Sequence, residues 1–160
     1  MNLYIVIAPF IFLHCFHSAF TFPRHASCNV EWNVGENCKS AAIKIVNQIR
    51  IWNNTDCGTG EKCRYGLDLF DGAILKARHV TPHAHYVDFL IITFEPNNTE
   101  CAIRGLSNSG VWYAYLDQST NYCNLHNLIT GSHLDKTPHY HEKTSDSTCT
   151  QYSTANCEKY

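Results

Sequence analysis

Two short segments repeat one arrangement of histidines. Residues 81–85 read Thr-Pro-His-Ala-His, and residues 137–141 read Thr-Pro-His-Tyr-His. In an extended chain, side chains two residues apart point to the same side, about 7 Å apart. Imidazole nitrogens are common ligands of Zn²⁺ and Cu²⁺. One hypothesis is a metal site; the alternative is two solvated loops that titrate near neutral pH. The metal site would use His83, His85, His139 and His141.

Cysteine is the second residue type that constrains the chemistry. Of the nine cysteines, Cys15 lies beside the apolar N-terminal run. The others form an even set, which in an exported chain predicts a disulfide framework and argues against a cysteine nucleophile. This set is Cys28, Cys38, Cys57, Cys63, Cys101, Cys123, Cys149 and Cys157. Sequence alone leaves their pairing open. Pairing nearest neighbours predicts Cys28–Cys38, Cys57–Cys63, Cys101–Cys123 and Cys149–Cys157.

The N-terminus and two glycosylation sequons predict export. Residues 3–13 are apolar but shorter than the about 20 residues of a membrane span, so residues 1–21 are interpreted as a signal peptide. Asn53 and Asn97 each begin an Asn-x-Thr sequon, placed where loops are expected. We therefore expect a secreted, extracellular glycoprotein without a membrane span.

Composition limits the classes of partner and the number of domains. Charged residues make up 16% of the chain and the formal net charge is −2, which gives no electrostatic case for nucleic-acid binding. Residues 22–130 have the length of one domain. Residues 131–160 are polar and almost free of aliphatic side chains, so they are predicted to form a C-terminal extension pinned by disulfides.

Hydrophobic periodicity predicts one helix followed by strands. Ala42, Ile45, Val46 and Ile49 recur with helical spacing, and Asn37 or Ser40 could cap a helix that ends near Trp52. Strands are expected at residues 69–80, bent near Gly72, and at 86–94, 101–107 and 111–117. The short connections predict antiparallel hairpins. The fold class is therefore α+β: one N-terminal helix on a meandering antiparallel sheet of about four strands.

The order of these elements resembles that of the cystatin family over about residues 40–116. The segment 86–101, YVDFLIITFEPNNTEC, is similar to the cystatin strand that begins with Tyr after the first inhibitory hairpin and ends in Thr-x-Cys. The resemblance implies a cystatin-like fold and places residues 79–83 in the first inhibitory hairpin.

The sequence departs from the inhibitory cystatins in that hairpin. Their Gln-x-Val-x-Gly motif is replaced here by His79, Val80, Thr81, Pro82 and His83. Proline restricts its own φ and the preceding residue, and histidine adds a ring where the family has glycine. The family's Pro-Trp second hairpin is missing as well. We therefore expect weak or no inhibition of papain-like proteases, while these five residues remain candidates for a binding surface.

Other residues were considered for catalysis and for binding. No serine lies in a Gly-x-Ser-x-Gly elbow. Asp88 interrupts an apolar strand, and alternation with Phe89 suggests that it lies on the exposed face of the sheet. Tyr113 and Tyr115 are expected to point outward as a partner surface. Trp112, Ala114 and Leu116 are expected to form the core set of the same strand.

These observations predict a secreted, non-enzymatic binding module without a cofactor. Its expected partner is an unidentified extracellular protein, for which a protease is one candidate. The first alternative is a cysteine protease inhibitor with a divergent first hairpin. The second alternative is a secreted protein that binds a metal or a small ligand.

Overall fold

A computed structural model describes residues 25–160. The expected signal peptide and Cys15 lie outside these residues. The α+β class is confirmed, although the sheet has six strands and a second helix follows it. In chain order the elements are β1 (Ser27–Val34), α1 (Cys38–Ile51), β2 (Tyr65–Phe70), β3 (Ile74–Val80), β4 (Val87–Asn97), β5 (Glu100–Ser109), α2 (Thr120–Gly131) and β6 (His141–Lys143).

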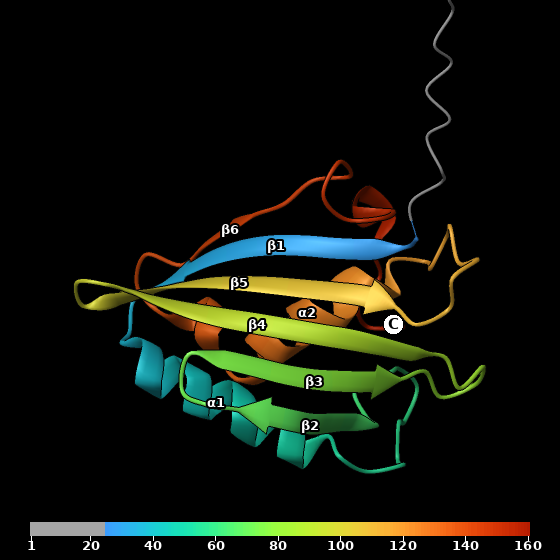
Figure 1. Cartoon of the computed structure of the whole chain (residues 1–160), viewed down its shortest axis with the longest axis horizontal. Helices are drawn as coiled ribbons and strands as arrows, with labels where there is room; N and C mark the ends of the chain where they lie inside the picture. Colours follow the sequence, from blue (N-terminus) through green and yellow to red (C-terminus); the bar gives the residue numbers. More distant parts are fainter. Residues whose placement is uncertain (1–24) are drawn as a thin grey trace, which may run out of the picture.

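The sheet is antiparallel, with the strand order β2-β3-β4-β5-β1-β6. The first strand in the chain therefore lies inside the sheet, where β1 pairs with β5 from Ser27 opposite Asn108 to Val34 opposite Cys101. Both helices lie behind the sheet in Figure 1. We call the end with the β3–β4 and β5–α2 connections, residues 81–86 and 110–119, the loop end. The β4–β5 hairpin lies at the far end.

Helix α1 forms where the periodicity predicts it. The side chain of Asn37 caps it by accepting a hydrogen bond from the backbone N–H of Ser40 at 2.9 Å. The apolar stripe that includes Ile45 and Ile49 is buried. It packs against β2, β4 and β5, and the buried core that it joins includes Ile92 of β4. This single core contains most of the apolar burial that stabilises the fold.

Two strand predictions require correction. The segment 69–80 is not one bent strand, because Asp71 accepts hydrogen bonds from the N–H groups of Ala73 and Ile74 and closes a turn between β2 and β3. Gly72 supports that turn with a φ of +101°. The segment 111–117 is not a strand but a loop. Its β-propensity has no effect because both edges of β5 are already paired, with β4 and with β1.

Four disulfides cross-link the described residues, and one of the four predicted pairings is confirmed. Cys57–Cys63 closes a short loop as expected. The other three pairings were wrong: the structure has Cys28–Cys149, Cys38–Cys101 and Cys123–Cys157. Nearest neighbours in sequence fail here because β1 lies beside β5, and residues 131–160 return across β1 and α2. No helix among residues 25–160 is long and apolar enough to cross a membrane.

The close contact between Gly105 and Trp32 provides a test of the core. A Cβ atom at Gly105 would lie 2.7 Å from Cζ3 of Trp32 and 3.1 Å from Cδ2 of Leu125. We expect Gly105→Ala to lower the free energy of unfolding by about 1–3 kcal/mol, because the added methyl group overpacks the core. Urea denaturation of the disulfide-intact protein measures this.

The matched control for this variant is Gly66→Ala. There the nearest atom is Nε of the flexible Arg78 side chain at 3.3 Å, so we expect a change within about 0.5 kcal/mol. Equal stability of the two variants would contradict the packing described for β1, β5 and α2.

Candidate binding pocket at the loop end of the sheet

Four segments of the chain meet at the loop end and enclose a pocket of about 360 Å³. They are the loop closed by Cys57–Cys63, the β3–β4 connection, the β5–α2 connection and residues 159–160. Its walls include the apolar side chains of Ala84, Tyr86, Ala114 and Leu116, and two of the acidic side chains that line it, Glu61 and Asp88, are buried. The pocket is thus an apolar opening above two buried carboxyl groups.

Glu61 is held in the disulfide-closed loop, and 9% of its surface is exposed. Its Oε2 atom has no hydrogen-bond partner among the described residues. Burial raises the pKa of the Glu61 carboxyl to about 7, and the neighbouring Asp88 carboxyl adds to the shift, while Lys159 opposes it. Glu61 therefore gains or loses its proton near neutral pH.

Asp88 is buried, with 3% exposure, so the expectation that it lies on the exposed face was wrong. Its Oδ2 accepts a hydrogen bond from the side-chain amide of Asn124 at 2.8 Å. Burial raises the pKa of Asp88 to about 6, although the bond from Asn124 lowers it. Sequence alternation could not choose the face, because β4 is apolar on both sides; the exposed side chain is Phe89.

His79 lies behind the pocket and not on its surface. It is fully buried, its Nε2 is 3.0 Å from the backbone oxygen of Glu61, and its ring centroid is 4.6 Å from that of Tyr65. Burial lowers the pKa of His79 to about 4, so its imidazole is neutral at physiological pH. The residue expected at a contact surface instead supports the loop that carries Glu61.

Buried asparagines of α2 support the pocket from below, and no sequence expectation included them. Asn121 donates from its side chain to the backbone oxygen of Ala26 and to Asp117, while Asn124 donates to Asp88. Asn127 donates to the backbone oxygen of Tyr160 at 3.0 Å. The spacing of these asparagines, three residues apart, was the available signal. It did not predict a buried helix face because such faces are ordinarily apolar.

The structure brings the two predicted binding segments to the same end of the sheet. Thr81 closes the β3–β4 connection, accepting from the N–H of Tyr86 at 2.9 Å, and is itself buried. Val80, the last residue of β3, and Pro82 are half-buried, and His83 is exposed. The β5–α2 connection carries Tyr113 and Tyr115, which are exposed as expected.

The core set expected in the β5–α2 connection was wrong, since Ala114 is only half-buried and lies outside the core, and the other two members are exposed. Trp112 is 70% exposed and Leu116 is 73% exposed. The ring of Trp112 packs edge-on against Tyr113, with centroids 5.5 Å apart. Leu116 and Ala114 line the pocket opening, to which the β3–β4 connection contributes Tyr86. Apolar side chains therefore surround the opening without being covered.

The two histidine pairs are not brought together. His83 and His85 lie in the connection before β4, at the loop end, whereas Nδ1 of His139 is 2.7 Å from Glu100 at the start of β5. The length of β4 separates the pairs by about 30 Å. Within residues 25–160, no three His, Cys, Asp or Glu side chains group closely enough to hold a metal ion. Both sequon asparagines, Asn53 and Asn97, are exposed.

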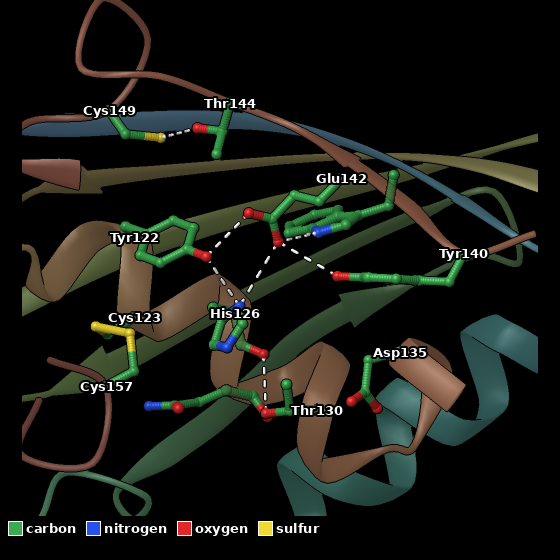
Figure 2. A network of polar contacts seen from close by, with 12 residues as sticks. Tyr122, Cys123, His126, Thr130, Asp135, Tyr140, Glu142, Thr144, Cys149 and Cys157 are labelled. Carbon is green, nitrogen blue, oxygen red and sulfur yellow. Dashed lines mark hydrogen bonds and ion pairs between the residues drawn. A yellow bond between two sulfur atoms is a disulfide. The ribbon is translucent and has the colours of Figure 1, made fainter. Parts of the chain in front are cut away.

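A second polar cluster centres on Glu142 of β6 and joins the C-terminal segment to the fold (Figure 2). Its carboxylate accepts hydrogen bonds from Trp32 Nε1 at 2.8 Å, Tyr122 OH at 2.9 Å and Tyr140 OH at 3.3 Å. Burial would raise the pKa of Glu142, but hydrogen bonds from His126, Trp32 and Tyr122 bring it below its ordinary value. We interpret this satisfied carboxylate as a structural clamp.

Glu61 differs from Glu142 in its number of hydrogen-bond donors, and Asp88 is intermediate in this number, with one donor from Asn124. Glu142 has three donors, whereas Glu61 Oε2 has none within the described chain. Carboxyl groups that titrate near neutral pH can pair with a cation or exchange a proton with a bound group. The loop-end pocket is therefore the candidate functional site.

Comparisons with known proteins add no assignment to this geometry. No protein-family model, curated protein or solved structure matches this chain. The fold described above is therefore established by the structure alone, and the resemblance to cystatins rests only on the residues that first indicated it.

The raised pKa of Glu61 makes a prediction about stability and pH. Its pKa is about 7 in the folded protein and near its ordinary value of 4.5 when the chain is unfolded. Ionised Glu61 therefore costs stability as pH rises between these values, and the full cost is present above them. We expect Glu61→Gln to be more stable than the wild type above pH 7, with the difference vanishing towards pH 4.5.

Urea denaturation across this pH range measures the difference between the two proteins. Glu95→Gln is the control, because Glu95 is exposed near the far end of β4 and its replacement should shift stability little at any pH. A Glu61→Gln variant that is less stable than the wild type at pH 8 would contradict the described burial of this carboxyl.

Proposed function

We propose that this chain is a secreted, non-enzymatic binding module of cystatin-like architecture that binds an extracellular protein through its loop end. One observation carries the proposal: large apolar side chains are exposed in the β3–β4 and β5–α2 connections, and two of them, Tyr86 and Leu116, line the pocket. Their exposed fractions are 48% for Tyr86, 70% for Trp112, 56% for Tyr113, 47% for Tyr115 and 73% for Leu116. Tyrosine and tryptophan are enriched in protein interfaces and among the residues that dominate binding energy.

The position of the patch favours binding over a purely structural role. It occupies two connections, whereas the core beneath is complete without it. Disulfides persist in oxidising compartments, and the four in this chain support an extracellular location. Loops on a rigid scaffold are the usual place for recognition residues.

Inhibition of a cysteine protease remains the second candidate, because the β3–β4 connection with Pro82 and His83 lies beside the exposed aromatic loop. The two connections line one pocket and could enter a cleft together. The contact would then use His83 and Trp112, while His79, which is fully buried, would not reach a protease.

The β5–α2 connection provides the test of the binding surface. We expect the wild-type secreted protein to capture a specific partner from its own extracellular fluid. The double variant Trp112→Ser, Leu116→Ser should reduce the captured amount at least about tenfold, because exposed apolar anchors are lost. Quantitative mass spectrometry of the captured proteins measures this.

Leu69→Ser is the matched control, because Leu69 is 47% exposed on β2, away from the loop end. The Leu69→Ser variant should capture the same amount of partner protein as the wild type. Equal capture by the double variant would rule out the β5–α2 connection as the binding surface. A papain-like protease among the captured proteins, inhibited by the wild type and not by the double variant, would favour the second candidate.

A further inference from the structure

At the floor of the loop-end pocket, one carboxyl oxygen has no hydrogen-bond partner among the described residues. The exposed aromatic side chains of the connections do not account for it. Glu61 is nine-tenths buried, lines the pocket, and has one carboxyl oxygen without any hydrogen-bond partner within the described chain. A buried polar atom without a partner is costly and uncommon in folded proteins. A donor group that enters the pocket and bonds to the Glu61 carboxyl would lower that cost.

The charges around the pocket favour a cation. Its lining contains the carboxyl groups of Glu61, Asp88 and Asp117 but one ammonium group, that of Lys159. Asp117 is occupied at the start of α2, where it accepts from the N–H groups of Ser119 and Asn121. Lys159 is exposed and donates to the hydroxyl of Tyr160 at 2.6 Å. Lys159 is the one ammonium group in the lining near Glu61, and neither it nor any other cationic side chain of the described residues bonds to Glu61 or Asp88, so a cationic ligand would add the missing partner.

The size and the walls of the pocket define the rest of the ligand. Its volume of about 360 Å³ is at the low end for ligand sites, which span about 300–1,000 Å³, so it accepts one small group. Ala114 and Leu116 offer an apolar wall above the carboxyl groups. An ammonium group has three donors and no acceptor, which suits two carboxyl groups that line one small pocket.

We propose that this pocket binds a primary ammonium group on an apolar stem, with the nitrogen at Glu61 and Asp88 and the stem against Ala114 and Leu116. The inference deepens the proposed function and rests on it, because a lysine side chain of the protein partner would supply this chemistry. A free alkyl or aryl amine has the same chemistry and is the other possible source.

Isothermal titration calorimetry of the secreted protein at about pH 8, where Glu61 is ionised, tests the ammonium site. The probes are phenethylamine, its uncharged analogue 2-phenylethanol, and a short peptide with one lysine between apolar residues. We expect the amine to bind at least about tenfold more tightly than the alcohol, because only the ammonium group can make a charge-assisted hydrogen bond to the carboxylates. Glu61→Gln and Asp88→Asn should each weaken amine binding by a similar factor, and Glu95→Gln should leave it unchanged.

The outcomes separate this inference from the proposed function. Partner capture by the wild type without amine binding would overturn the ammonium site and leave the protein-binding surface standing. Amine binding that Glu61→Gln does not weaken would also overturn it. If the lysine peptide binds and competes with the captured partner, the source is the partner's lysine. Amine binding with no captured protein would support the site, assign it to a free amine and overturn the proposed protein partner.

Discussion

The buried hydrogen bond between Asn124 and Asp88 is the interaction on which the rest of the arrangement depends. It joins α2 to β4 at 2.8 Å, in a layer from which water is excluded. Either group alone would be a buried polar group without its partner, at a cost of about 1–3 kcal/mol. The bond fixes how α2 approaches the sheet, and it places the Asp88 carboxyl at the floor of the pocket beside Glu61.

This constraint also accounts for the C-terminal segment. Helix α2 turns asparagines towards the sheet and the core, so its packing needs support from further covalent and polar contacts. Cys123–Cys157 ties the segment to α2, Cys28–Cys149 ties it to β1, and Glu142 bonds to Trp32 and Tyr122. A segment that looks too polar to fold thus becomes ordered through disulfides and one satisfied carboxylate rather than through apolar burial.

The sequence predicted those parts of the fold that local patterns determine. Helix α1 has an apolar stripe and a cap, β4 is rich in β-branched and aromatic residues, and β5 alternates in burial, so these elements lie close to where they were expected. Helix α2 was missed although Tyr122, Leu125 and Ile129 have helical spacing, because buried asparagines alternate with them and make the segment look polar. The disulfide pairing and the partner of β1 depend on contacts between distant residues, which no local pattern contains.

The residues of the candidate site were likewise found from the sequence only in part. The β3–β4 connection was singled out by its resemblance to the first cystatin hairpin, and Tyr113 by alternation along a strand at residues 111–117 that the structure does not contain. Glu61 was not, since its role arises from burial beside Asp88 in a loop that Cys57–Cys63 closes. The face that Asp88 occupies could not be chosen from β4, whose apolar residues point both ways.

The carboxyl groups of Glu61 and Asp88 are desolvated together at the floor of an apolar opening. Carbon-13 NMR of the side-chain carboxyl groups, recorded as a function of pH, measures their ionisation directly. We expect Glu61 to titrate with a pKa of about 7 and Asp88 with a pKa of about 6. If both groups instead titrate near their ordinary pKa values of 4.5 and 3.8, the carboxyl groups are hydrated, the pocket floor is open to water, and the described burial is wrong.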